Sequence, residues 1–254
     1  MFRPRVIPVL LLKDKGLVKS VRFQSHRYIG DPINTVKIFN DLRADELIFF
    51  DTDATAQRRS ISLDFVKKVG DEANMPFAVG GGISSINQIK EILNAGAEKV
   101  VLNTHALSHP NFIREAADSF GSSTVVVAVD VGKNWMGRWK VYSNSGNRST
   151  NLNPIDWALQ AESAGAGEVI INSIRHDGHM MGYELDLIKS VAEAVSIPVI
   201  ALGGAGELSH LKEAVDIAHA SAVAAGSLFI YHGSRRGILV NYPDQLQLRH
   251  LFTV

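Results

Sequence analysis

The sequence predicts an α/β fold, a (β/α)8 barrel that occupies residues 1–254 as a single domain. The length of 254 residues matches the ~250 that such barrels typically use as one domain. Eight short apolar or β-branched runs alternate with helical patterns, as expected for a closed parallel sheet covered by helices. The two halves of the chain also resemble each other, which favours a barrel built from two four-strand halves.

The predicted strands are nearly continuous apolar runs, which is typical of parallel strands that are buried on both faces. They are Arg5–Leu12, Glu46–Phe50, Pro76–Val79, Lys99–Leu102, Val125–Asp130, Glu168–Ile171, Pro198–Ala201 and Ala222–Ala225. Proline marks three helix starts, and glycine marks three helix ends. These signals are Asp31-Pro32, His109-Pro110, Asn153-Pro154, Gly96, Gly121 and Gly165. An open doubly wound sheet is the competing architecture, and the repeat disfavours it.

The half-chain repeat is visible in two pairs of segments. GGGISSINQIKEILNAGAEKVVLNT (80–104) matches GGAGELSHLKEAVDIAHASAVAAGS (203–227), and DELIFFD matches GEVIINS. A duplicated barrel predicts two similar sites, one in each half. The same comparison of halves places Asp130 opposite Leu11.

Composition excludes several functional classes. Lys+Arg and Asp+Glu are equal at 26 each, so nothing suggests the basic stripe of a nucleic-acid-binding protein, and we expect no nucleic-acid partner. No apolar run reaches the ~18 residues of a membrane span, and the N-terminal run reads as a strand and not as a signal peptide. Zero cysteines exclude disulfides and a cysteine nucleophile. We therefore expect a cytoplasmic protein with no membrane partner, no metal and no cofactor.

Two glycine turns predict phosphate sites. Each turn follows a strand and precedes a helix, where backbone N–H groups and the helix N-terminus favour an anion. Hydroxyl residues end the next strand of each half and suit the same ligand. The predicted residues are Gly81, Gly82, Asn103 and Thr104 in the first half, and Gly203, Gly204, Gly226 and Ser227 in the second. The structural alternative is that the glycines only shape tight turns, and their duplication favours two phosphate sites.

Carboxylates at strand ends are the candidate acid–base groups. Asp130 ends the fifth strand, where catalytic residues of such barrels lie, although it could instead cap the next turn. Asp51 ends the second strand and is expected to orient the substrate. Asp177-Gly178 follow the sixth strand and join the predicted phosphate-binding set. His176 and His179 do not make a metal site without a third ligand.

The segments RVIPVLLLKD, DELIFFD, VGGGI, AEKVVLNT, FGSSTVVVAVD, AGEVIINSI, DG…GYE and GGAG occur in order along nearly the whole chain. They resemble the HisF-like cyclase subunit of imidazole glycerol phosphate synthase, the glutamine-dependent enzyme of histidine biosynthesis. The resemblance implies a TIM barrel that takes ammonia from a separate HisH-like glutaminase subunit. It also implies a lyase and cyclisation reaction on a nucleotide that carries a phosphate at each end.

The same resemblance assigns roles to individual residues. It implies that Asp130 is one of two catalytic aspartates and that Leu11 stands where the second should be, so cyclase activity is in doubt. Lys19 matches a catalytic lysine on a mobile loop, and Asn172 joins Asp51 as a substrate-orienting residue. Four charged residues that open their strands match the family's ammonia gate: Arg5, Glu46, Lys99 and Glu168. Their structural alternative is a stabilising plug at the barrel bottom.

Departures from the family point to a paralogous branch. Arg175 stands where the family has an acidic residue, and His179 stands where it has threonine. The tail SLFIYHGSRRGILVNYP also differs. The chain resembles a branch of surface-saccharide gene clusters that supplies ammonia for an acetamidino sugar, with a sugar amidotransferase as a possible further partner. The alternatives are an authentic histidine-pathway cyclase and a noncatalytic scaffold that activates the glutaminase.

Overall fold

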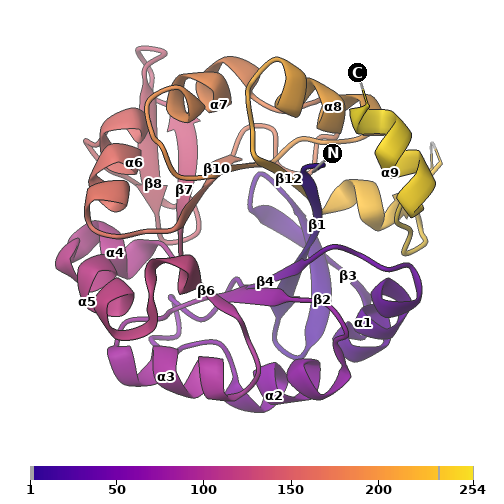
Figure 1. Ribbon diagram of the computed structural model, residues 1–254, viewed down its shortest axis with the longest axis horizontal. Helices are drawn as coiled ribbons and strands as arrows, with labels where there is room; N and C mark the ends of the chain where they lie inside the picture. Colours follow the sequence, from indigo (N-terminus) through magenta and orange to yellow (C-terminus); the bar gives the residue numbers. More distant parts are fainter. Residues whose placement is uncertain (1–2, 234, 254) are drawn as a thin grey trace.

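The computed structural model describes residues 3–233 and 235–253 and shows eight parallel strands closed into a barrel inside a ring of helices (Figure 1). The barrel strands are β1 (Arg5–Lys13), β4 (Leu47–Asp51), β5 (Phe77–Gly80), β6 (Lys99–Leu102), β7 (Val125–Lys133), β10 (Glu168–Ser173), β11 (Val199–Leu202) and β12 (Ala222–Ala225). Neighbours in this order pair in parallel, and β12 pairs with β1 to close the barrel. The predicted fold class and all eight strands are confirmed.

The helices cover the outside of the barrel and begin where the sequence indicates. They are α1 (Pro32–Asp41), α2 (Leu63–Glu72), α3 (Ile86–Asn94), α4 (Thr104–Ser108), α5 (Asn111–Phe120), α6 (Pro154–Ser163), α7 (Leu185–Ala192), α8 (Leu208–Asp216) and α9 (Gln245–Phe252). Asp31 and Asn153 are N-caps whose side chains accept backbone N–H bonds, and Gly121 is the C-cap of α5. No helix of the described residues combines the length and the apolar character that crossing a membrane requires.

Three antiparallel hairpins were not predicted from the sequence. Their strands are β2 (Gly16–Val21) with β3 (Gln24–Gly30), β8 (Trp139–Ser143) with β9 (Arg148–Ser149), and β13 (Tyr231–His232) with β14 (Gly237–Ile238). β2 pairs with the end of β1, and β8 pairs with the end of β7. The first strand of each half, β1 or β7, therefore pairs at its end with an antiparallel hairpin strand. The two halves of the barrel resemble each other in this respect as well as in sequence. β7 continues past Asp130 to Lys133 because β8 pairs with it there.

The turn between β2 and β3 explains why that hairpin was missed. Its residues Arg22 and Phe23 have φ of 53° and 62°, a region that favours glycine or asparagine, neither of which is present. The loop after β10 holds the turn in place. The backbone carbonyl of Asp177 accepts a hydrogen bond from the N–H of Arg22 at 3.1 Å. The carboxylate of Asp177 accepts a second one from the N–H of Phe23, also at 3.1 Å. A contact that is distant in sequence thus replaces the local turn signal.

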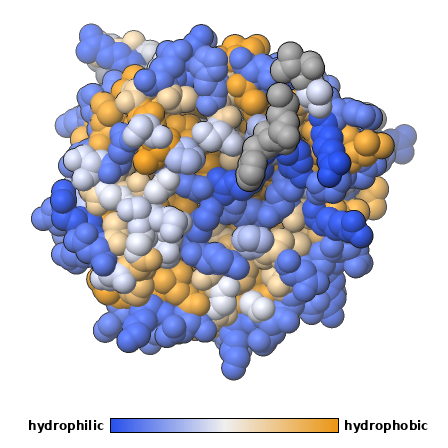
Figure 2. Space-filling view, in the orientation of Figure 1, coloured by the Kyte–Doolittle hydropathy of each residue, from blue (hydrophilic) through white to orange (hydrophobic). Residues whose placement is uncertain are grey.

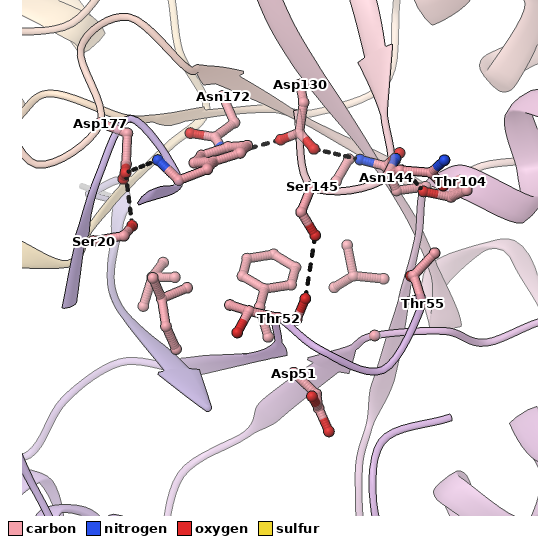
Figure 3. Close-up of a pocket in the computed structure, with 18 of the residues that line it drawn as sticks. Ser20, Asp51, Thr52, Thr55, Thr104, Asp130, Asn144, Ser145, Asn172 and Asp177 are labelled. Carbon is pink, nitrogen blue, oxygen red and sulfur yellow. Dashed lines mark hydrogen bonds between the residues drawn. The ribbon is translucent and has the colours of Figure 1, made fainter. Parts of the chain in front are cut away.

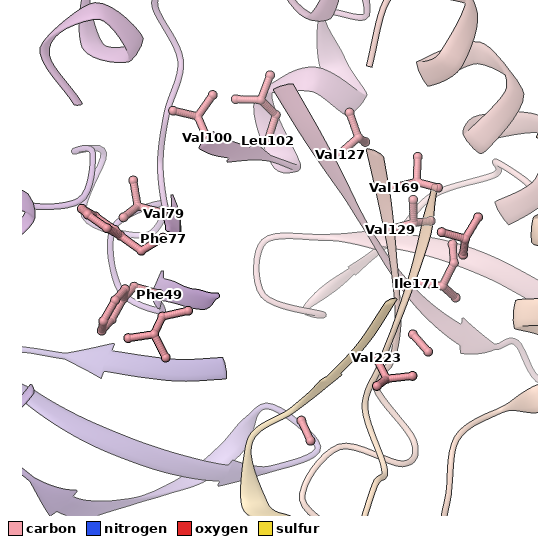
Figure 4. Close-up of a cluster of buried hydrophobic side chains, with 14 of the residues drawn as sticks. Phe49, Phe77, Val79, Val100, Leu102, Val127, Val129, Val169, Ile171 and Val223 are labelled. Atoms are coloured by element: carbon pink, nitrogen blue, oxygen red, sulfur yellow. The ribbon is translucent and has the colours of Figure 1, made fainter. Parts of the chain in front are cut away.

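Side chains alternate between two buried clusters along the strands. Outward-facing residues such as Phe49, Val127 and Ile171 pack beneath the helices (Figure 4). The inward-facing residues form a second, smaller cluster inside the barrel: Ile7, Val9, Ile48, Ala78, Val101, Val126, Ala128, Ile170, Ile200, Leu202, Ala222 and Ala224. Since side chains alternate with period two, the inward positions before and after this apolar layer lie at the two ends of the barrel axis.

Candidate functional site

One cavity of about 710 Å³ opens at the carboxyl ends of the barrel strands (Figure 3). It is lined by Leu11 and by every predicted residue of this face: Lys19, Asp51, Gly81, Gly82, Asn103, Thr104, Asp130, Asn172, Asp177, Gly178, Gly203, Gly204, Gly226 and Ser227. The structure thus brings together residues from both halves of the chain. Their individual roles remain predictions.

Asp130 is held by two amides at the floor of this cavity. Asn103 Nδ2 donates to Oδ2 at 2.8 Å, and Asn172 Nδ2 donates to Oδ1 at 2.9 Å. Burial raises the pKa of Asp130 to about 6, although both amide hydrogen bonds act in the opposite direction. Within the described residues, the Oδ1 atoms of both asparagines are buried without a hydrogen-bond partner. The carboxyl group is therefore rigidly placed and titrates near neutral pH, which suits a proton-transfer group.

Leu11 lies across the barrel from Asp130. It is on β1, separated from β7 by β4, β5 and β6 in one direction around the sheet. Its side chain lines the cavity and packs with Phe50 against the apolar layer inside the barrel. An aliphatic side chain cannot donate or accept a proton, so Leu11 adds no acid–base group to the wall opposite Asp130.

Lys19 reaches the cavity from β2. Its side chain is buried, and Nζ donates to the carbonyl of Val9 at 2.7 Å. Burial lowers the pKa of Lys19 to about 8, partly opposed by the charge of Asp177. A Cβ added to Gly226 would lie 2.4 Å from Nζ, so the amino group sits directly against the second-half phosphate residues that the sequence predicts.

Asp177 fastens the β2–β3 hairpin over the cavity (Figure 3). Its carboxylate accepts from Ser20 Oγ at 2.8 Å as well as from the N–H of Phe23. Burial raises the pKa of Asp177 despite these bonds. Gly178 has φ of 72°, and a Cβ there would lie 2.2 Å from the carbonyl oxygen of Ser20. The carboxylate of Asp177 is thus engaged in holding the hairpin, and the adjacent glycine allows the close approach.

Asp51 is neutralised by a residue that sequence reasoning missed. The guanidinium of Arg59 forms an ion pair with it, including a 3.3 Å bond from Nη2 to Oδ1. The hydrogen bond to Asp51 raises the pKa of Arg59, with burial opposing it. The adjacent Arg58-Arg59 pair in the loop after the second strand was the available signal. Other missed residues of the lining are His26, Arg58, His105, His109, Asn144 and Ser145.

The two glycine turns differ in what surrounds them. A Cβ on Gly82 would lie 1.8 Å from the Arg59 carbonyl, and one on Gly204 would lie 2.0 Å from the Gly182 carbonyl. The start of α3 is closed by a capping box between Ser85 and Gln88. The start of α8 has no side-chain capping bond. Both turns require glycine, and the capping box of α3 takes up one N–H group of its first turn, whereas no N-cap side chain takes up those of α8.

The two histidines of the loop after β10 make local contacts. His176 Nδ1 lies 2.7 Å from the carbonyl of Gly182, and its Nε2 lies 3.2 Å from Glu184. His179 accepts from Arg22 Nε at 3.1 Å. These contacts tie the loop to itself and to the β2–β3 hairpin.

The opposite end of the barrel axis carries a ring of alternating charges, which we call the charged ring: Arg5, Glu46, Lys99 and Glu168. The guanidinium of Arg5 forms an ion pair with Glu46 and another with Glu168, the second at 2.6 Å. Lys99 also bridges both, at 3.3 Å to Glu46 and 3.1 Å to Glu168. All four matched residues therefore meet, and two cations neutralise two anions as a buried cluster requires. The view down the axis in Figure 2 shows hydrophilic surface over the centre of the barrel.

Comparison with known proteins agrees with this geometry. Residues 5–235 match the family model described as "Histidine biosynthesis protein". The chain is 44% identical over 244 residues to the "Putative imidazole glycerol phosphate synthase subunit hisF2" of Pseudomonas aeruginosa, covering 96% of this chain and 97% of that protein. It is 42% identical over 232 residues to the "Imidazole glycerol phosphate synthase subunit HisF" of Thermococcus onnurineus, covering 91% of each. The chain therefore belongs to the histidine biosynthesis protein family, as a HisF-like barrel.

Proposed function

We propose that this chain is the barrel subunit of a glutamine amidotransferase complex and conducts ammonia from a HisH-like glutaminase along the barrel axis. The supporting observation is the order of layers on that axis: charged ring, apolar layer, then the cavity that contains Asp130. Neutral ammonia can cross an apolar layer, whereas an ammonium ion would have to be desolvated at a large cost. The chain contains no cysteine, so a cysteine-dependent glutaminase must be another polypeptide.

The charged ring is the proposed entry gate. Lys99 reaches two carboxylates with one ammonium group, at 3.1 and 3.3 Å, whereas Arg5 offers a planar, two-ended guanidinium. Lys99 is therefore the member most easily displaced when ammonia passes. Glu46→Gln removes the charge but keeps the shape of the side chain and one oxygen that can accept from Arg5 or Lys99, so it tests the gate with less disruption than Glu46→Ala.

At the other end, we propose that the cavity binds a ligand with two phosphates. Gly82 and Thr104 form one proposed anion site, and Gly204 and Ser227 form the other. The uncapped start of α8 and the adjacent amino group of Lys19 favour negative charge at the second site. Crystals grown in sulfate or phosphate should hold an anion at each pair. Phosphate-soaked crystals with only water at both pairs would contradict the two-site proposal.

The acceptor of the ammonia is proposed to be a surface-saccharide precursor and not the histidine-pathway nucleotide. Leu11 supports this, since loss of one acid–base partner typically reduces rate ~10²–10⁴-fold. The alternative, an authentic cyclase, is favoured by the 42% identity to the Thermococcus protein. Purified barrel given the histidine-pathway nucleotide and an ammonium salt decides between them, because robust turnover would support the cyclase.

The complex itself is tested with the glutaminase encoded in the same genome. We expect the two chains to co-purify and glutaminase activity to rise when the barrel is added. Glu46→Gln should leave co-purification intact while changing the fraction of ammonia that reaches the cavity. Failure of the purified chains to associate would refute the proposal. Association and glutaminase activation without passage of ammonia would favour the noncatalytic scaffold.

A further inference from the structure

Four excursions of the chain surround the mouth of the cavity and form one continuous surface, which we call the rim. The rim comprises residues 16–30, 133–151, 174–184 and 231–239, of which residue 234 lies outside the described residues. The first and third segments bond through Arg22 N–H and the Asp177 carbonyl. Arg236 Nη1 donates to the Gly178 carbonyl at 3.4 Å, which joins the fourth segment to the third. Gly146 of the second segment lies against Phe23, since a Cβ there would be 3.0 Å from that ring.

The rim is strongly cationic although the whole chain is neutral. Its only acidic residues are Asp177 and Glu184, and neither is exposed. Its exposed basic residues are Arg22, Arg27, Lys133, Arg138, Arg148, Arg175, Arg235 and Arg236. Because the whole chain is neutral, the acidic residues that balance these cations lie elsewhere on the barrel. Positive charge is therefore concentrated on the rim.

The rim also carries the three most exposed large apolar side chains of the described residues. They are Trp135 at 92%, Met181 at 77% and Tyr28 at 65%, each on a different excursion. Met136, Ile238 and Leu239 are exposed on the same surface. Exposed apolar groups of this kind at loop tips contribute nothing to the barrel core and mark interaction sites when they gather on one face.

We propose that the rim is the docking surface for a second protein partner, one whose contacting face carries acidic residues around an apolar patch. Charge complementarity argues for the acidic face. The composition argues for protein: seven of the eight exposed cations are arginine, and arginine, tryptophan, tyrosine and methionine are the types enriched at protein interfaces. Exposed aliphatic residues such as Ile238 and Leu239 offer no stacking surface to nucleic-acid bases.

The position of the rim determines what such a partner can do. It surrounds the open end of the cavity, and the charged ring lies at the other end of the barrel axis. A protein seated on the rim would cover the mouth and receive directly what leaves the cavity, with no contact to the charged ring. The inference stands on the surface alone and does not require the glutaminase proposal to hold.

The first experiment identifies the partner in cells of the source organism. A photo-crosslinking amino acid replaces Trp135, and the matched control places it at Leu246, which is 62% exposed on α9. We expect one protein to be crosslinked from position 135 and not from 246. Crosslinks only to another copy of this chain, or no crosslinked protein, would overturn the inference.

The second experiment titrates that purified protein against the purified barrel. We expect Trp135→Ala to raise the Kd roughly tenfold. The double charge reversal Arg138→Glu with Arg148→Glu should raise the Kd at least about tenfold and make it less dependent on salt. The matched double reversal Lys67→Glu with Lys90→Glu, on exposed positions of α2 and α3, should change it less than about twofold. Equal effects of both reversals, or no effect of Trp135→Ala, would refute docking at the rim.

Two further measurements separate this inference from other readings. Single-stranded DNA that binds the barrel, with a Kd that both the rim charge reversal and Trp135→Ala raise, would overturn the protein partner in favour of a nucleic acid whose bases stack on that ring. Glu46→Gln should leave the rim partner's Kd unchanged, so failure of the glutaminase complex and failure of rim docking give different results.

Discussion

Replacing Asp130 by asparagine should stabilise the protein at neutral and alkaline pH. Burial disfavours the charged carboxylate and raises its pKa from 3.8 to about 6. Asparagine has the same shape and cannot ionise. It can accept from one neighbouring amide and donate to the other, since Asn103 Oδ1 and Asn172 Oδ1 are buried acceptors without partners. The substitution therefore removes a buried charge without leaving its two neighbours unsatisfied.

The magnitude follows from the pKa difference between the folded and unfolded chain. About two pKa units at ~1.4 kcal/mol each give about 3 kcal/mol. Below pH 3.8 the carboxyl group is protonated in both states and costs nothing. Between pH 3.8 and 6 the unfolded state releases this proton while the folded state still holds it, so the stability of the native chain falls across that window. The full cost is present above pH 6.

Urea unfolding of the native chain and Asp130→Asn at pH 4 and pH 8 measures this effect. The difference in unfolding free energy should be about 2.5 kcal/mol more favourable to the variant at pH 8 than at pH 4, because the unfolded carboxyl group is already partly ionised at pH 4. Titrations common to both proteins cancel in this comparison. Asp118→Asn, on the exposed face of α5, is the control and should show no comparable change with pH. A difference that is the same at both pH values would refute the raised pKa of Asp130.

Three other substitutions test neighbouring parts of the structure. Lys19→Met should raise the unfolding free energy at pH 7 by about 3 kcal/mol, since the folded-state pKa is about 8. This gain should disappear between pH 8 and 10.5, where the folded lysine is already neutral, and a gain that persists at pH 10.5 would contradict the prediction. Tyr183→Phe removes a buried 2.9 Å hydrogen bond to a backbone carbonyl and should cost about 1–2 kcal/mol in urea unfolding; an unchanged midpoint would show that the bond is dispensable. Gly204→Ala should lower the free energy of unfolding more than Gly137→Ala does. Both glycines have positive φ, but only at Gly204 would the added Cβ meet a backbone atom, at 2.0 Å. Equal losses would mean that backbone strain alone matters.

Periodicity in the sequence was sufficient to predict the barrel and the two ends of its axis. Buried parallel strands are continuous apolar runs, so their positions are a local property of the chain. Side-chain alternation then relates Glu168, Ile170 and Asn172 on one strand: charged ring, apolar layer and cavity follow at every second residue. Residues at strand ends were therefore assigned to the correct end before any contact was known.

The pairing of side chains within the cavity was not predictable in this way. Asp130 meets amides that are 27 and 42 residues away in sequence, and Asp51 is neutralised by Arg59 of the following loop. Such contacts depend on how neighbouring strands are staggered in the closed sheet, which no local pattern encodes. The ionisation of Asp130 is for the same reason a property of the tertiary structure, because its burial and both hydrogen bonds come from other strands.

The sequence by itself thus determined the barrel, the repeat and the set of polar residues at each end, because these depend on local hydrophobic patterning. Only the tertiary structure decided the β2–β3 hairpin and the rim to which it belongs. Arg22 and Phe23 occupy a backbone conformation that their own residue types disfavour, and the long-range bonds from Asp177 compensate for it. Where a contact distant in sequence supplies the stabilisation, the local residues carry no signal of the structure that they adopt.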